Sequence, residues 1–133
     1  SDIAEIAIAS EEGGADALSM INTLVGMAVD INSLKPRLSN VTGGLSGPAI
    51  KPVALAMVYR ASKATKLPII GIGGIKNYED VIEFFLCGAS AVQIGTYNFI
   101  DPMTPMNIIN DLDIWLDRKG YGSPSELTGK IEV

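Results

Sequence analysis

The sequence predicts an α/β fold: the carboxyl-terminal half of a (β/α)8 TIM barrel, with a long strand-to-helix loop that contains a small hairpin. Strand and helix patterns alternate three times along the 133 residues, which is typical of a parallel sheet covered by helices. Residues 14–20 also resemble residues 88–94, and each segment closes a helix and opens a strand, which favours a barrel over an open sheet. Because a barrel needs eight strands and roughly 250 residues, we expect residues 1–133 to be half of a single domain, with the amino half absent from this chain.

The chain is predicted to begin with a helix and a short strand. Asp2 and Glu5 have the spacing of a capping box, and apolar residues then recur at helical spacing until Gly13. The strand covers residues 16–21. The chain also starts without an initiator methionine and directly in a helix, so we expect that an upstream segment has been removed.

A long connection and a second helix follow. Residues 24–46 have few apolar clusters, and within them 28–31 and 36–38 are suited to a small hairpin. Connections of this length inside a compact domain are usually functional lids or binding loops. Pro48 then fits the first position of a helix whose apolar residues keep helical spacing to about Thr65.

The rest of the chain repeats the strand and helix pattern and ends in a polar tail at residues 121–133, which is predicted to be irregular. The predicted elements are a strand at 68–70 with a glycine turn at 71–75, a helix from the N-cap Asn77 to Gly88, and a strand at 91–94. A last helix is predicted with Thr104 as N-cap and Pro105 as first residue. Its apolar stripe consists of Ile108, Ile109, Leu112, Trp115 and Leu116.

Composition excludes several classes of function. The net charge of -5 and the pI near 4.6 argue against a nucleic-acid partner. A single cysteine and no histidine exclude an internal disulfide and a multi-cysteine metal site, so we expect no metal, and the chemistry must rest on carboxylates, amides, hydroxyls or a cofactor. No apolar run reaches the ~18 residues that span a bilayer and the start has no signal-peptide pattern, so we expect no membrane partner and a cytoplasmic location.

Glycines at the ends of two consecutive strands predict a phosphate site. Gly73 and Gly74 follow one strand, Gly95 and Thr96 follow the next, and a short helix after Thr96 would direct its positive end to the same point. In barrels of this kind the loops after strands seven and eight commonly bind phosphate. Either pair alone could equally be a tight turn, but their joint placement suits a phosphate monoester such as that of FMN. The glycine spacing does not match a dinucleotide fingerprint.

Two further segments are candidates for ligand contacts. The helix start after Gly47 offers free N–H groups as a third arm of the phosphate site, although a flexible loop explains the same glycines. Asn22 and Thr23 lie at the carboxyl end of a predicted strand, where barrel enzymes place substrate contacts, and capping of the turn is the alternative. Cys87 is expected to be packed rather than nucleophilic. The acidic residues Glu79, Asp80 and Glu83 are expected to form a solvated helix face.

Four ordered motifs resemble a known family. Residues 21–24, 40–52, 68–75 and 88–96 are similar to the carboxyl half of dihydroorotate dehydrogenases, and the segment from Thr42 to Pro52 is closest to the NAD-linked class 1B catalytic subunits. The resemblance covers essentially the whole chain. It implies a flavoprotein oxidoreductase that converts dihydroorotate to orotate in pyrimidine (UMP) biosynthesis, with residues 1–133 as half of one FMN-binding TIM-barrel domain.

The resemblance also implies roles for individual residues. The catalytic cysteine base and the flavin-contacting lysines of the family lie in the amino half, so no catalytic residue is expected in this chain, and Cys87 does not match that cysteine. Positions that match FMN contacts are Ile21, Gly47, Gly73, Gly74, Gly95 and Thr96, and positions that match contacts to the orotate ring are Asn22 and Thr23.

The class 1B resemblance implies partners. These are the missing amino half of the barrel, a second catalytic subunit in a homodimer, and an electron-transfer subunit that carries FAD and a [2Fe-2S] cluster. The chain alone is therefore expected to be inactive. Two alternatives stay open: another FMN-binding barrel oxidoreductase, which would accept a ring other than orotate, and a non-catalytic half-barrel that holds flavin or docks a partner.

Overall fold

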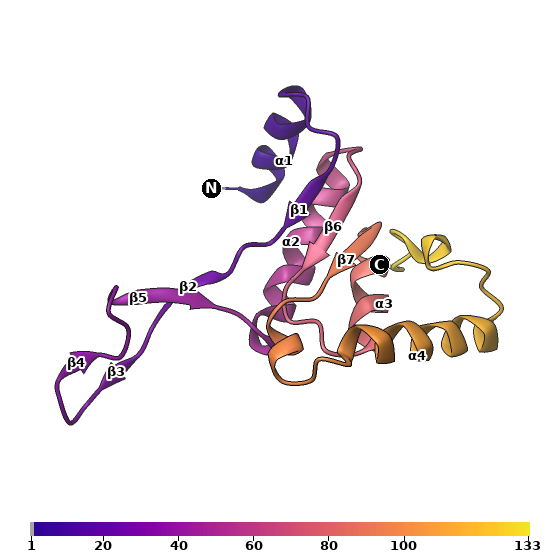
Figure 1. Cartoon of the computed structure of the whole chain (residues 1–133). Helices are drawn as coiled ribbons and strands as arrows, with labels where there is room; N and C mark the ends of the chain where they lie inside the picture. The colour runs from indigo at the N-terminus through magenta and orange to yellow at the C-terminus, as the bar shows by residue number, and fades with distance from the viewer. Residues whose placement is uncertain (1) are drawn as a thin grey trace.

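The computed structural model describes residues 2–133, and its body is a three-stranded parallel sheet with helices against one face (Figure 1). The strands are β1 (Leu18–Met20), β6 (Ile69–Ile72) and β7 (Ala91–Gln93), in the order β1-β6-β7. In register, Ile70 lies between Ser19 of β1 and Ala91 of β7. The predicted α/β class with a parallel sheet is confirmed, and the arrangement is consistent with part of a (β/α)8 barrel.

Each strand is joined to the next through a helix, as a parallel sheet requires. Asp2 caps the first helix by accepting a hydrogen bond from the Ala4 N–H, and Asn77 caps the third by accepting one from the Asp80 N–H. The helices are α1 (Ile3–Glu12), α2 (Lys51–Ala64), α3 (Tyr78–Leu86) and α4 (Thr104–Lys119), with 3-10 turns η1 (Pro48–Ile50), η2 (Thr96–Phe99) and η3 (Pro124–Leu127).

The core lies between the sheet and these helices. Val58 of α2, Ile69 of β6 and Phe84 of α3 are the largest fully buried side chains. Gly71 in β6 leaves room for the Phe84 ring, because a Cβ at this position would overlap it. Helix α3 therefore packs close against the central strand.

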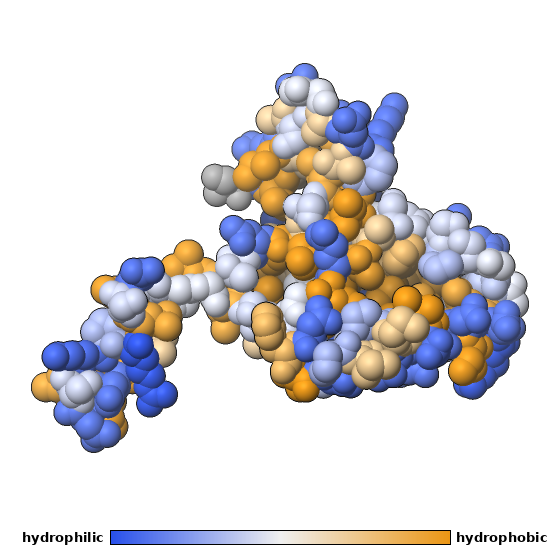
Figure 2. Space-filling model, viewed as in Figure 1, coloured by the Kyte–Doolittle hydropathy of each residue, from blue (hydrophilic) through white to orange (hydrophobic). Residues whose placement is uncertain are grey.

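The other face of the sheet has no covering layer in the described part of the chain. Ser19, Ala91 and Gln93 are exposed on it, and the Ser19 hydroxyl donates a hydrogen bond of 2.8 Å to Oε1 of Gln93. Figure 2 shows apolar residues gathered on the viewed face of the body, over and beside the sheet. Both edge strands, β1 and β7, are also unpaired on their outer sides among residues 2–133.

The connection between β1 and α2 projects from the body as an arm (Figure 1). At its base β2 (Leu24–Met27) pairs antiparallel with β5 (Thr42–Leu45), and farther out β3 (Val29–Asp30) pairs with β4 (Lys35–Pro36). The hairpin expected at 28–31 and 36–38 falls in this outer part, whereas the pairing of β2 with β5 was not predicted. Apolar side chains of the arm are widely exposed, Val25 and Leu34 at 85% and 84%.

Several predicted boundaries are wrong. Strand β6 continues to Ile72, so the turn begins only at Gly73. Thr104 is the first helical residue of α4 and not its cap, because its hydroxyl donates to the Asp101 carbonyl and Met103 takes the cap position. Ile109 was placed in the apolar stripe but is 59% exposed.

The tail predicted to be irregular contains the η3 turn. Ser123 and Glu126 form a capping box at its start, and Leu127 is buried against the core. The contact ties the end of the chain to α3, where the Gly129 N–H also donates to the Phe85 carbonyl. Among residues 2–133, no helix has the length and hydropathy to cross a bilayer.

Candidate functional site

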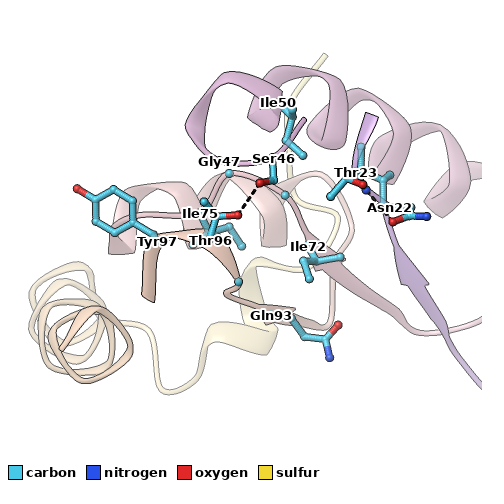
Figure 3. A pocket seen from close by; sticks show the side chains of 14 residues that line it. Asn22, Thr23, Ser46, Gly47, Ile50, Ile72, Ile75, Gln93, Thr96 and Tyr97 are labelled. Carbon is cyan, nitrogen blue, oxygen red and sulfur yellow. Dashed lines mark hydrogen bonds between the residues drawn. The ribbon is translucent and has the colours of Figure 1, made fainter. Parts of the chain in front are cut away.

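A cavity of about 170 Å³ lies at the carboxyl ends of the three strands (Figure 3). Its walls come from four segments: the end of β1, the base of the arm with η1, the turn after β6, and the turn after β7. The eight residues that the sequence predicted for ligand contacts all line it, namely Ile21, Asn22, Thr23, Gly47, Gly73, Gly74, Gly95 and Thr96.

The turn after β6 is packed so closely that it requires glycine. Gly73 and Gly74 both have positive φ, 142° and 75°. A Cβ on Gly73 would lie 2.8 Å from the Cβ of Ala54, and one on Gly74 would lie 2.8 Å from the Gly47 carbonyl oxygen and 2.9 Å from the Lys51 nitrogen. The turn therefore rests directly on the start of α2, and no side chain fits between them.

The turn after β7 is open. Gly95 has φ of -107°, and a Cβ built on it meets no atom within 4 Å. Thr96 then begins η2, which makes its N–H one of the groups that a helical turn leaves without an internal acceptor. Outside the bonds of the helices and strands, the N–H groups of Gly74 and Gly95 donate no hydrogen bond in the described part of the chain either.

The base of the arm forms the third wall. Gly47 is buried with φ of 87°, and its carbonyl accepts a hydrogen bond of 3.1 Å from the Ile50 N–H as η1 begins. Beside it, the Thr96 hydroxyl donates a hydrogen bond of 2.8 Å to the Ser46 hydroxyl. In Figure 3 these two side chains point toward one another, so they connect the arm to the turn after β7.

The end of β1 forms the fourth wall. The Ile21 N–H donates to the Ile72 carbonyl at 2.9 Å and extends the pairing with β6 by one residue. Asn22 and Thr23 follow and are exposed, with the Thr23 N–H donating to Oδ1 of Asn22 at 2.8 Å. The Thr23 side chain packs against Gly44 of β5, where a Cβ would overlap it. A local hydrogen bond and one strand contact thus hold these two polar side chains.

The electrostatics of the cavity suit the end of an anionic ligand. No acidic or basic side chain is among its lining residues, while the N–H groups of Gly74, Gly95 and Thr96 in the two turns have no partner among the described residues. Such groups at strand and helix ends are common phosphate donors. The volume is below the ~300–1,000 Å³ of a typical complete ligand site, so these walls fit one part of a larger ligand.

An ion-pair network lies next to the turn after β6. The Lys51 ammonium donates to Oδ1 of Asp80 at 2.5 Å and lies 2.8 Å from Oε2 of Glu83. Burial lowers the pKa of Lys51, but its hydrogen bonds to Asp80 and Glu83 outweigh this and raise the pKa above 10.5. The predicted solvated position is wrong for Asp80, which is 2% exposed.

The sequence analysis assigned no role to Tyr97, Gln93 or Ser46, which also line the cavity. Ser46 stands in the glycine-rich segment that was singled out, so its position carried a signal. Tyr97 and Gln93 also had one, because each lies within two residues of the predicted contacts Gly95 and Thr96. Cys87 lies outside the lining; burial, and then the Glu83 carboxylate, raise the pKa of its thiol, which keeps it protonated.

Comparison with known proteins identifies close relatives. The family model for dihydroorotate dehydrogenase matches residues 1–116. The chain is 54% identical over 132 residues to the dihydroorotate dehydrogenase B (NAD(+)) catalytic subunit of Caldicellulosiruptor saccharolyticus, covering 99% of this chain and 44% of the relative. It is 59% identical over 129 residues to the subunit of the same name in Anoxybacillus flavithermus, covering 97% and 41%. The chain thus spans less than half the length of these curated relatives.

Proposed function

The chain belongs to the dihydroorotate dehydrogenase family, and from this premise we propose that it is the carboxyl-terminal half of a flavin enzyme that oxidises dihydroorotate to orotate in pyrimidine biosynthesis. In this proposal residues 1–133 are half of one FMN-binding barrel domain. They supply the FMN phosphate site and part of the orotate pocket. The observation that carries the proposal is the single cavity lined by all eight residues predicted for these ligands.

The phosphate of FMN is proposed to bind between the two glycine turns. The N–H groups of Gly73 and Gly74 would donate from one side, and those of Gly95 and Thr96 from the other. Ile21 and Gly47 would complete the wall next to the rest of the cofactor. When bound, the flavin accepts hydride from a carbon of the substrate ring. The role of this chain is to hold the cofactor rigidly, since hydride transfer depends on the alignment of the two rings.

Asn22 and Thr23 are proposed to contact the dihydroorotate or orotate ring. Because Oδ1 of Asn22 accepts the hydrogen bond from the Thr23 N–H, the Asn22 amide NH₂ is left as the donor to a ligand. The Thr23 hydroxyl can donate or accept. A planar ring with carbonyl and carboxylate oxygens and ring N–H groups matches this pair of side chains.

The missing amino half of the barrel is the first partner in this proposal. For 14.0 kDa a compact monomer exposes about 6,700 Å², whereas this chain exposes 8356 Å². The arm exposes apolar side chains such as Val25 and Leu34, and the body leaves one sheet face and two strand edges uncovered. The sheet face and the strand edges are the surfaces that further barrel strands would cover. The base that removes the substrate proton would come from that half, so residues 1–133 alone would be inactive.

The name of the relatives describes an NAD(+)-linked catalytic subunit, which supports a partner that transfers electrons. We propose a homodimer of catalytic subunits together with an electron-transfer subunit that carries FAD and a [2Fe-2S] cluster. Electrons from dihydroorotate would pass through FMN to that subunit and then to NAD. The exposed apolar residues of the arm offer a surface for one of these contacts.

The test uses the complete subunit, meaning this chain together with an amino-terminal half. We expect the purified subunit to contain FMN, seen in its visible spectrum, and to reduce that flavin when dihydroorotate is added without oxygen. Residues 1–133 alone should give no turnover. A complete subunit that retains FMN but is reduced only by a different ring compound would contradict the substrate, and one that has no affinity for flavin would contradict the cofactor.

A further inference from the structure

Asp80 is a buried carboxylate next to the cavity, on the first turn of α3. It is not among the cavity lining residues, so it does not contact the ligand space. Its surroundings nevertheless connect it to the turn after β6. Oδ2 accepts a hydrogen bond of 2.9 Å from the Lys76 N–H, two residues beyond Gly74, and Oδ1 accepts the one from Lys51.

These two bonds hold the turn from both sides. Lys51 is the first residue of α2, and its backbone nitrogen is one of the two backbone atoms that leave no room for a Cβ on Gly74. Lys76 follows the turn at its other end. A single carboxylate thus joins the chain after the turn to the helix on which the turn rests. Such charge-assisted bonds are stronger than neutral ones, and their geometry is retained more firmly when they are buried.

We propose that Asp80 is a positioning residue for the phosphate site. It fixes the Gly73–Gly74 turn on the start of α2, so that the two N–H groups of the turn face the cavity. This inference rests on the proposed function, because it concerns the same phosphate site. Asn77 contributes to the same arrangement, since its side chain accepts a hydrogen bond from the Asp80 N–H and caps the first turn of α3.

The charge of Asp80 would weaken phosphate binding, whereas positioning by Asp80 would strengthen it, and this difference in direction makes the proposal testable. A carboxylate near an anionic ligand repels it, so replacing Asp80 with a neutral residue would strengthen phosphate binding if charge alone mattered. If Asp80 acts by positioning, the same replacement weakens phosphate binding, because the donors are no longer aligned. The direction of the change therefore separates the two effects.

The experiment measures FMN and riboflavin affinity in the deflavinated complete subunit, by quenching of flavin fluorescence. Riboflavin lacks the phosphate, so the ratio of the two affinities reports the phosphate site. We expect Asp80→Asn to lower the preference for FMN about tenfold, the scale of one lost charge-assisted hydrogen bond. In a variant that keeps its fold by circular dichroism, an equal drop in both affinities, or an unchanged or raised ratio, would overturn the proposal.

Glu83→Gln is the matched control. Glu83 pairs with the same Lys51 ammonium but has no bond to the turn, and its side chain is 45% exposed. We expect its FMN preference to stay within about twofold of the wild type. An equal loss in both variants would count against positioning by Asp80.

Lys51→Gln covers the case in which Asp80→Asn does not fold, as judged by circular dichroism. It removes the ammonium but leaves Asp80 bonded to the Lys76 N–H, and we expect a smaller drop in FMN preference, about threefold. An unchanged ratio there would overturn the proposal. A wild-type subunit with no preference for FMN over riboflavin would overturn the phosphate site itself, whereas a preference that Asp80→Asn retains would overturn only the role of Asp80.

Discussion

The turn after the central strand β6 and the turn after the edge strand β7 both contain glycine and both line the cavity, but the structure around the two glycines differs. Gly74 has positive φ and lies against the Lys51 nitrogen and the Gly47 carbonyl, so the fold itself excludes a side chain. Gly95 has negative φ and open space where a Cβ would be. The fold itself therefore requires glycine at Gly74, whereas it sets no such requirement at Gly95, where a proposed ligand contact is the remaining reason for glycine.

The largest effect is expected for Gly74→Ala. The new methyl group would overlap backbone atoms and require an unfavourable φ, so the free energy of unfolding of the complete subunit should fall by roughly 2–4 kcal/mol. Urea unfolding monitored by circular dichroism measures this loss. If the variant unfolds at the same urea concentration as the wild type, the two turns are not different in the way described.

Gly95→Glu is expected to separate binding from stability. A carboxylate beside the proposed phosphate position should lower FMN affinity on the order of 100-fold, because like charges that are forced together cost several kcal/mol. The free energy of unfolding of the flavin-free protein should change by about 0.5 kcal/mol or less, since no atom is displaced. Flavin titration and urea unfolding of the same samples give both values.

Gly95→Ala is the control for Gly95→Glu, and we expect it to reduce FMN affinity far less, because it adds no charge. Full retention of FMN by Gly95→Glu would contradict the phosphate assignment of this turn. A large loss of stability in Gly95→Glu would instead show that the open space is filled in the complete subunit.

The smallest effect expected is a change of thermal stability with pH. It concerns only the turn after β6, which lies next to the ion pair of Lys51 and Asp80. The pKa of Lys51 is raised in the folded chain, so its stabilising contribution is fully present below about pH 10.5 and is lost as the pH rises through the folded pKa. The difference in melting temperature between wild type and Lys51→Met should be constant at neutral pH and should shrink above pH 10.5. A difference that grows with pH would contradict the ion pair.

Local patterns predicted most of the fold. Helix caps at Asp2 and Asn77 depend on residues close in sequence, and both lie where expected. The helix expected from Pro48 is also present, although α2 begins only at Lys51, after the 3-10 turn η1. The eight predicted site residues share one cavity for a related reason, because the carboxyl ends of parallel strands meet at one edge of the sheet. Their roles toward ligands remain predictions.

Contacts between residues far apart in the sequence could not be predicted from these local patterns. Asp80 has acidic neighbours and a surface-like pattern, and its burial depends on bonds from the Lys76 N–H and from Lys51, which is 29 residues away. The pairing of β2 with β5 was missed because Gly43 and Gly44 weaken the strand signal. Thr104 was predicted as a cap because Thr followed by Pro is a common helix start. In the structure its hydroxyl instead donates a hydrogen bond to the preceding Asp101 carbonyl. The capping box at Ser123 and Glu126 was visible in the sequence and was overlooked.

The arm between β1 and α2 enters and leaves the body at the cavity, through Thr23 on one side and Ser46 on the other. Pairing of β2 with β5 fastens these two ends together before the chain reaches the tip. Insertions or deletions between Met27 and Thr42 would therefore leave the separation of Thr23 and Ser46 unchanged. Doubling the length of such a loop costs only about 0.6 kcal/mol in closure entropy. A tip of different length or composition would thus leave the cavity walls at Thr23 and Ser46 in place.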